Sequence, residues 1–443
     1  MTIDAARSDS KRVTGHGLVL PIESPEPMRS LALAYTHYLA DCCRQFLAVA
    51  PQLPPAMRAA HDRCAVLVRQ GLGHNRPQVL RCFASSAVST PLHCVPLREN
   101  MPAFATRIDG AVAQMMPHLL LEMALRNLIP AGQSVTWEHG APRLTSVAIG
   151  GQLIPPADAG GLRFAPDHVA AIRNGEEVAR VELDRAGLQR CARASQGFRF
   201  EQRYRRVGNV SNFATIDHNP IAAFEAHPEK AGNHIDLGER SEDEWVGTLD
   251  ESFALIERFM PGEFAEMGLM LHEIIPVGYD AVRHLSASYR EVVGTIYLTL
   301  HPNVMTMTEA VIHEFQHNKL NVSSYSTDYL NNAFHPLYQS PIRPDPRPLW
   351  GILLAVHAFL PVAELYRRMR DGGHPLAALP EFDRRMAEID LKNHEGMEML
   401  RVHGEFTPAG RAMIDELEML EHRHLAEHTA RGVDTTPTEV HLG

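Results

Sequence analysis

The chain has 443 residues, of which 45% are hydrophobic, and its formal net charge is -11 at pH 7. This length allows two or more domains with large cores, and the acidic balance gives no electrostatic reason to expect nucleic acid or an anionic membrane as a partner. The polar N-terminus lacks the apolar core of a signal peptide, and no uninterrupted apolar run is long enough to span a bilayer. We therefore expect a cytoplasmic protein.

The spacing of the cysteines is typical of a protein from a reducing compartment. None forms a Cys-x-x-Cys pair, and all of them precede the histidine motif described below, so they predict buried thiols and not disulfides or zinc ligands. The six are Cys42, Cys43, Cys64, Cys82, Cys94 and Cys191.

The first half of the chain changes from a helical to a strand pattern. Residues 1–27 are polar and proline-spaced, which predicts a flexible tail. From residue 28 to 49 apolar side chains recur at helical spacing, and further helices are expected at residues 55–71 and 104–128. Residues 134–207 form short, alternating or β-branched segments separated by Gly, Pro and Asp, which predicts a small antiparallel sheet.

The last of these strand segments is basic. Its arginines are interpreted as a solvated face or, alternatively, as a dock for an acidic segment of a peptide. They are Arg199, Arg203, Arg205 and Arg206.

The acidic, glycine-containing residues 232–245 predict a linker between two domains. We expect an N-terminal α+β domain over residues 28–245 and a mostly helical second domain over residues 246–430, followed by a second flexible tail at residues 431–443. The chain as a whole is therefore expected to have an α+β fold. The helices expected in the second domain cover residues 249–259, 306–321, 348–369, 380–402 and 408–428, with another ending near residue 273.

The strongest chemical signal is a His-Glu-x-x-His motif in the second domain. Thr306 and Glu309 have the spacing of a capping box, which predicts the start of a helix. On that helix His313 and His317 are one turn apart, so both imidazoles can bind one metal ion. Glu314 lies beside the metal position, as the general base does in zinc peptidases with this motif.

A β-branched, alternating strand at residues 295–300 is expected to precede the motif. In enzymes with this motif such a strand commonly forms the edge along which an extended peptide lies. The context therefore favours a metal enzyme that acts on a peptide over a chance match.

A third metal ligand is expected from outside this helix, because Glu314 should point to a different face from the two histidines. The candidate is the apolar helix at residues 348–369, whose surface His357 and Glu364 interrupt two turns apart. We predict His357, since it lies mid-helix where packing should be closest. Glu364 is the alternative, although it is also spaced to pair with arginines one turn later.

Three stretches of the second domain resemble one family. They are LSASYREVVGTIYLTL at residues 285–300, VIHEFQHNKL at residues 311–320, and YQSPIRPDPRPLWGILLAVHAFLPVAELYR at residues 338–367. The chain resembles, from about residue 253 to 368, the αKG-HExxH-type peptide β-hydroxylases of ribosomal peptide natural product biosynthesis. The resemblance implies a zincin-like HExxH domain that binds iron(II) and 2-oxoglutarate, and hydroxylation at the β-carbon of a residue in a ribosomal precursor peptide.

The residues are compatible with this chemistry. An iron oxygenase needs a facial set of protein ligands that leaves positions open for the oxoacid and dioxygen. The distal carboxylate of 2-oxoglutarate suits a guanidinium fork, for which Arg343 and Arg347 are candidates; these arginines would otherwise cap carbonyls or form surface pairs. In such a hydroxylase Glu314 would orient a ligand or a substrate amide. The alternatives are a zinc metallopeptidase with Glu314 as general base and a degenerate, peptide-binding accessory protein.

Overall fold

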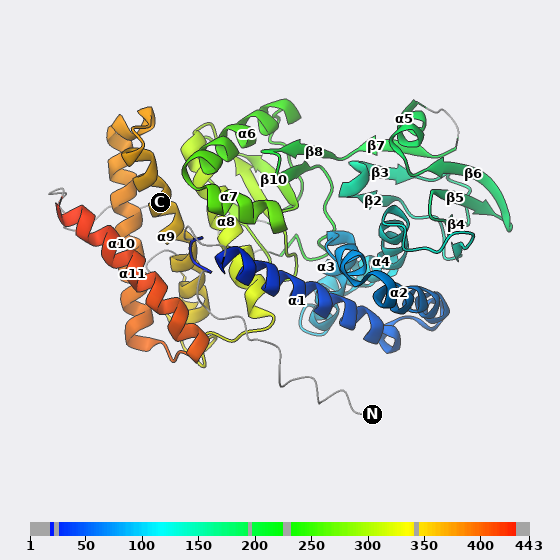
Figure 1. The fold of residues 1–443 in the computed structure, drawn as a ribbon, viewed down its shortest axis with the longest axis horizontal. Coiled ribbons are helices and arrows are strands. Elements are labelled where there is room, and N and C mark those ends of the chain that lie inside the picture. The colour runs from blue at the N-terminus through cyan, green and yellow to red at the C-terminus, as the bar shows by residue number, and fades with distance from the viewer. Residues whose placement is uncertain (1–17, 22–25, 194–196, 225–231, 341–344, 431–443) are drawn as a thin grey trace. The chain divides into compact units, whose positions relative to one another are not determined.

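The computed structural model describes residues 18–21, 26–193, 197–224, 232–340 and 345–430 (Figure 1). These residues form a mixed α+β fold in which helices predominate and the sheets are small, as predicted. The six cysteines are buried free thiols, also as predicted.

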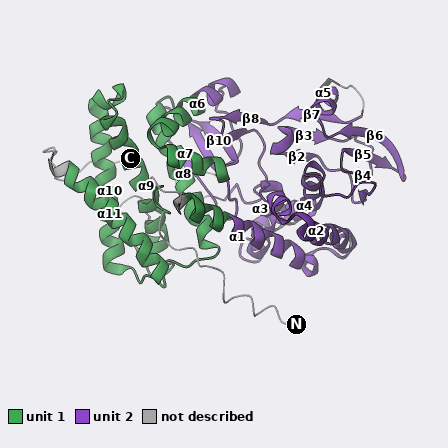
Figure 2. Cartoon of the chain, viewed as in Figure 1, with its two compact units in different colours: residues 1–35, 248–270, 302–443 green, residues 36–247, 271–301 purple. Residues whose placement is uncertain are grey.

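The chain divides into two compact units, and neither is continuous in sequence (Figure 2). Unit 1 comprises residues 1–35, 248–270 and 302–443, and unit 2 comprises residues 36–247 and 271–301. The expected boundary near residue 245 is close to one division, but a continuous second domain from residue 246 onward was not the correct arrangement. Residues 271–301 belong to unit 2 because one of their strands, β10, pairs both with β12 and with β9 of the first half of the chain.

Unit 2 contains the expected helices, and the division between the units falls inside the first of them. Proline interrupts α2, where Asn75 has a non-helical backbone two residues before Pro77. The helices are α1 (Glu26–Ala48), α2 (Pro55–Cys82), α3 (Ser86–Cys94), α4 (Ala105–Leu125) and α5 (Arg185–Arg193).

Three sheets complete unit 2. Two are antiparallel, with strand orders β1-β4-β5-β6 and β2-β3-β7, and the third is mixed, with the order β11-β12-β10-β9-β8. The arginine-rich segment is divided between two of them, because β7 and β8 belong to different sheets. The strands are β1 (Val135–Trp137), β2 (Leu144–Ser146), β3 (Gly151–Ile154), β4 (Gly161–Phe164), β5 (His168–Arg173), β6 (Glu176–Glu182), β7 (Arg199–Gln202), β8 (Tyr204–Val207), β9 (Ser211–Ala214), β10 (Glu273–Tyr279), β11 (Ser286–Ala287) and β12 (Thr295–Leu300).

The strand expected at residues 295–300 is present as β12, but it is not an edge strand. It pairs in parallel with β10 on one side and antiparallel with the short β11 on the other. All six of its residues are buried. The expectation that an extended peptide lies along this strand is therefore corrected, since its Tyr297 and Leu298 already face β11.

The predicted linker before residue 245 is partly helical. Helix α6 (Glu242–Phe259) begins inside it. Trp245 is fully buried, stacks on Phe213, and donates a hydrogen bond from its indole N–H to the Leu237 carbonyl at 3.1 Å. A buried tryptophan near its start fixes this segment in unit 2.

Unit 1 is built mainly from helices, and α9 is the central one. It packs against α8, α10 and α11 (Figure 1). Helix α9 is long and apolar enough to cross a membrane, but 72% of its apolar window is buried inside the protein, which is the character of a core helix. The elements are α7 (Pro261–Met270), α8 (Val304–Ser324), β13 (Leu337–Tyr338), β14 (Arg347–Pro348), α9 (Leu349–Asp371), α10 (Pro380–His403) and α11 (Pro408–Ala430), besides the later part of α6.

Part of the predicted N-terminal tail is buried in unit 1. Residues 1–17 and 22–25 of that tail, and the tail expected at residues 431–443, lie outside the described residues. Leu18 and Val19, by contrast, are buried. The Val19 carbonyl accepts a hydrogen bond from Gln316 of α8 at 3.1 Å. The tail prediction was therefore wrong for these residues.

Candidate metal centre

Helix α8 carries the motif, and it begins earlier than the capping-box prediction indicates. Asn303 is the N-cap, and its side-chain oxygen accepts from the Met305 N–H at 2.9 Å. Glu309 does not turn back to the helix start. Its carboxylate accepts from Arg385 of α10 at 2.7 Å and from the Tyr366 hydroxyl of α9. Glu309 therefore ties α8 to two neighbouring helices.

The motif residues come together as the spacing predicts. The rings of His313 and His317 meet edge to face with their centroids 4.3 Å apart. One ligand atom from each of His313, Glu314 and His317 lies within 4.8 Å of the other two. Glu314 thus stands closer to the histidine pair than expected from its different helical face, and the three side chains together could hold one ion.

The state of His317 suits a metal ligand. Burial lowers the pKa of its imidazole to about 4, so the ring is neutral at neutral pH, as metal binding requires. Its Nδ1 atom is buried without a hydrogen-bond partner. A buried nitrogen lone pair or N–H group without a partner is costly, and a bound ion or its hydration shell would remove that cost. Two imidazoles and a carboxylate are therefore a donor set that fits a transition metal.

An aromatic residue of α9 packs against His313. The Phe359 ring lies 4.4 Å from that of His313, measured between centroids. His357 is two residues earlier, about 200° around the helix axis, and so on nearly the opposite face. Helix α9 therefore presents an aromatic ring to His313, whereas His357 lies on another face of α9. There the charges of Lys319 and His317 of α8 also act on the imidazole of His357.

His357, the predicted third ligand, does not join the motif residues. It is fully buried, and its Nε2 atom bonds to the Leu18 carbonyl at 2.9 Å. Burial lowers the pKa of its imidazole to about 3. Within the part of the chain that the structure describes, the metal-ligand group at this motif comprises only the three motif residues. The observed geometry gives His357 a packing role, in which it holds the buried N-terminal segment.

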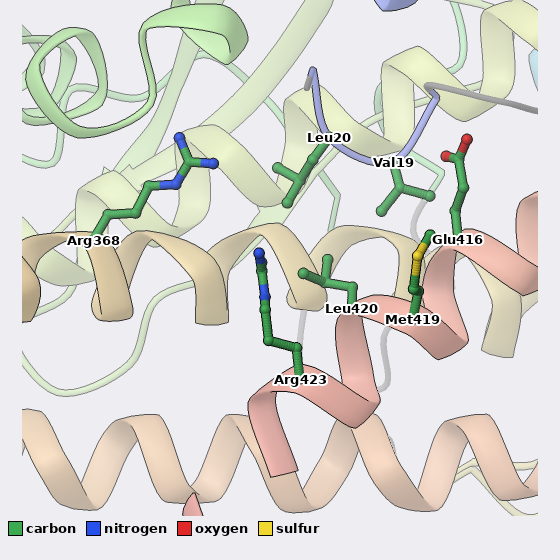
Figure 3. A pocket seen from close by; sticks show the side chains of 7 residues that line it. All are labelled: Val19, Leu20, Arg368, Glu416, Met419, Leu420 and Arg423. Atoms are coloured by element: carbon green, nitrogen blue, oxygen red, sulfur yellow. The ribbon is translucent and has the colours of Figure 1, made fainter. Parts of the chain in front are cut away.

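Glu364, the alternative ligand, forms ion pairs with neighbouring side chains. Its carboxylate accepts from Arg368 at 2.8 Å, from Arg423 at 2.6 Å and from His424 at 3.1 Å. These donors outweigh burial and lower the pKa of Glu364 to about 2. Arg368 and Arg423 also border a cavity of about 400 Å³ together with Val19 and Leu20 (Figure 3). Glu364 therefore joins α9 to α11.

Of the two arginines proposed for the oxoacid, Arg347 is among the described residues. Arg343 lies outside the described residues. Arg347 lies in β14 at the entrance to α9, and its Nε atom is 2.9 Å from Asp345 Oδ2. Its aliphatic carbons lie against the position that a side chain on Gly351 would occupy, at 3.6 Å. The structure thus fixes the stem of Arg347 on the first turn of α9.

A buried polar network that the sequence analysis missed lies on another face of α8. Lys319 donates to Glu266 of α7 at 2.6 Å, and Gln316 donates to Glu263 of α7, also at 2.6 Å. All four side chains are buried. The signal was present in the sequence as two polar pairs, each three residues apart, one on α7 and one on α8. The network anchors the motif's helix on α7.

The chain matches no protein-family model, and a search of curated proteins finds no match.

Proposed function

We propose that the protein is an iron(II)- and 2-oxoglutarate-dependent hydroxylase that acts on the β-carbon of a residue in a ribosomally made peptide. The observation that carries the proposal is the compact group of His313, Glu314 and His317. Two histidines and one carboxylate with open positions are the donor set of non-heme iron oxygenases. The resemblance of residues 253–368 to the αKG-HExxH-type peptide β-hydroxylases supplies the substrate class and a zincin-like domain. The polar N-terminus and the cysteine pattern support a cytoplasmic location.

In this proposal the chain's residues have separate tasks. His313 and His317 donate nitrogen lone pairs to the metal, and the neutral state of His317 keeps its lone pair available. Glu314 either completes the ligand set or orients a group bound there. Phe359 shields the side of the His313 ring from water. Arg347, with Arg343, supplies the positive charge for the distal carboxylate of 2-oxoglutarate.

Bound iron would supply dioxygen activation coupled to decarboxylation of 2-oxoglutarate. The overall reaction balances with one oxygen atom of dioxygen in the new hydroxyl group, the other in succinate, and release of carbon dioxide. The hydrogen removed from the β-carbon becomes that of the hydroxyl group. A ribosomal precursor peptide would be both partner and substrate.

A zinc metallopeptidase is the second candidate, because the position of Glu314 beside both histidines also suits a general base acting on a metal-bound water. Such a site needs three protein ligands as well as the water. The carboxylate cannot serve both as third ligand and as base, so the peptidase requires a further ligand that the motif does not contain.

The test is to reconstitute the protein with iron(II) without oxygen, then add 2-oxoglutarate, a candidate precursor peptide and air. We expect succinate in stoichiometric amounts and a peptide heavier by one oxygen atom. Peptide fragments formed with zinc and without oxygen would replace the proposal with the peptidase. Absence of both products together with tight peptide binding would identify an accessory protein.

A further inference from the structure

A second, unrelated cavity lies within unit 2. Its volume is about 300 Å³, and it lies between α3, α4 and the segment that follows β9. Gly110 of α4 borders it, and a side chain placed on that glycine would meet no atom within 4 Å. This volume is at the lower end of the range for small-molecule sites, and matches a ligand no larger than an amino acid or a peptide terminus.

Two neutral histidines form part of the cavity wall. His118 Nδ1 lies 2.7 Å from the Gln114 carbonyl, which can only accept, so Nδ1 carries the hydrogen. Burial lowers the pKa of His118, and its Nε2 atom therefore holds a free lone pair; that atom is buried with no hydrogen-bond partner. The Nε2 atom of His218 is likewise buried and unpartnered, and the two rings meet edge to face at 5.4 Å.

Asp217 adds a carboxyl group to the same wall. One of its oxygens accepts from the Tyr297 hydroxyl and from the Asn219 N–H, both at 2.9 Å. Burial nevertheless raises the pKa of Asp217 to about 7. The groups that oppose this rise are hydrogen-bond donors and not cations. A cation that binds beside a buried carboxyl group lowers the pKa of that group, so Asp217 would be ionised when a positively charged ligand is bound.

The cation that also borders the cavity is distant from this wall. Arg107 is exposed and lies about three turns before His118 on α4. This part of the cavity wall therefore combines a carboxyl group with two unpartnered nitrogen atoms, and the described residues that line it place no cation beside them.

We propose that this cavity binds a ligand through a primary ammonium group. Asp217 supplies the negative charge, His118 accepts a hydrogen bond at Nε2, and His218 does so in the tautomer that carries its hydrogen on Nδ1. An ammonium group offers three N–H donors, which matches these three acceptors. Because it is charged, it forms stronger hydrogen bonds than a neutral donor does. The ammonium group belongs to a small amine or to the amino terminus of a peptide. This inference does not depend on the proposed function of the metal centre.

Binding is tested by calorimetry with propylamine, and with 1-propanol as a neutral probe of the same shape. We expect propylamine to bind in the millimolar range and 1-propanol not to bind. Triglycine and its N-acetyl form distinguish the two sources: triglycine binding more tightly than propylamine, with loss on acetylation, indicates a peptide terminus. Equal binding of propylamine and 1-propanol, or no binding of any amine, would overturn the proposal.

The pH dependence gives an independent readout. Propylamine stays protonated throughout the neutral range. Since Asp217 has to be ionised, the affinity should rise by about tenfold between pH 6 and pH 8. The titratable groups around Asp217 are His118 of α4, Tyr204 of β8, Glu273 of β10, Tyr297 of β12, the adjacent His218 and the outer Arg107. Of these, Glu273 also has a pKa of about 7, so it needs a control.

Three variants complete the test. Asp217→Asn keeps an oxygen for Tyr297 and Asn219 but removes the charge, and should weaken propylamine binding at least tenfold and abolish its pH dependence. Glu273→Gln removes a buried carboxyl group that does not border the cavity, and should keep propylamine binding and its rise with pH, because Asp217 is retained. Gly110→Leu should block the cavity without altering either carboxyl group. Undiminished binding in Asp217→Asn, or in Gly110→Leu if the former does not fold, would overturn the assignment.

Discussion

Lys319 of the motif's helix donates to Glu266 of α7 at 2.6 Å, and both side chains are fully buried. Removal of one partner of such a pair leaves an uncompensated buried charge. We predict that Lys319→Met lowers the free energy of unfolding by about 3–5 kcal/mol, measured by urea denaturation. The double variant Lys319→Met, Glu266→Leu should recover most of this loss, because it replaces the pair with apolar side chains. A single variant as stable as the natural protein would show that the pair contributes little.

Glu263 in the same network should make stability fall as pH rises. Burial raises the pKa of Glu263 from 4.5 to about 8, so between these values the folded protein holds a proton that the unfolded chain has released. The contribution of Glu263 to the free energy of unfolding is fully present below pH 4.5 and is lost as the pH rises to about 8. Over this range the free energy of unfolding falls by at most about 1.4 kcal/mol per pH unit. Glu263→Gln keeps an oxygen to accept from Gln316. Relative to the natural protein, it should gain stability as the pH rises from 5 to 8 in denaturation series; parallel pH profiles would contradict this.

Arg347 is predicted to hold the distal carboxylate of 2-oxoglutarate. Arg347 is only partly buried and pairs with Asp345. A hydrogen bond to a charged group contributes about 1.5–3 kcal/mol, so Arg347→Ala should raise the apparent 2-oxoglutarate requirement about tenfold or more and change peptide affinity less. Arg370→Ala is the matched control, since Arg370 lies in the last turn of α9 and pairs with Asp383 of α10. Cosubstrate titrations that give the same requirement for Arg347→Ala and the control would exclude Arg347 from this role.

Local patterns in the sequence were sufficient for most elements of the fold. Apolar periodicity placed α1, α4 and α9–α11 within about two or three residues of their observed ends, because each helix buries one continuous stripe. The histidine motif also depends only on helical spacing, and His313 and His317 meet as predicted, whereas Glu314 lies closer to them than expected. The start of α8 was misplaced because two N-terminal signals competed, and the side chain of Asn303 caps the helix before Thr306 can.

Contacts between distant parts of the sequence could not be predicted in this way. The return of residues 271–301 to unit 2 depends on parallel pairing of β10 with β9, which leaves no local signal. His357 interrupts an apolar stripe, as a ligand would, and a buried histidine bonded to a carbonyl gives the same pattern. Only the fold shows that this carbonyl belongs to Leu18.

The last prediction concerns which residues retain the metal. His317→Ala should abolish binding of iron(II) or zinc, because it removes one of two imidazoles on the same helical face. His357→Ala should keep the metal bound and instead lower the free energy of unfolding by about 1–3 kcal/mol, since it leaves the buried Leu18 carbonyl without its donor. Glu364→Gln, which removes the charge that Arg368 and Arg423 share, should likewise affect stability and not metal content. Metal analysis of the purified variants, with urea denaturation alongside, separates these effects. Metal loss in His357→Ala as complete as in His317→Ala would restore His357 as the third ligand.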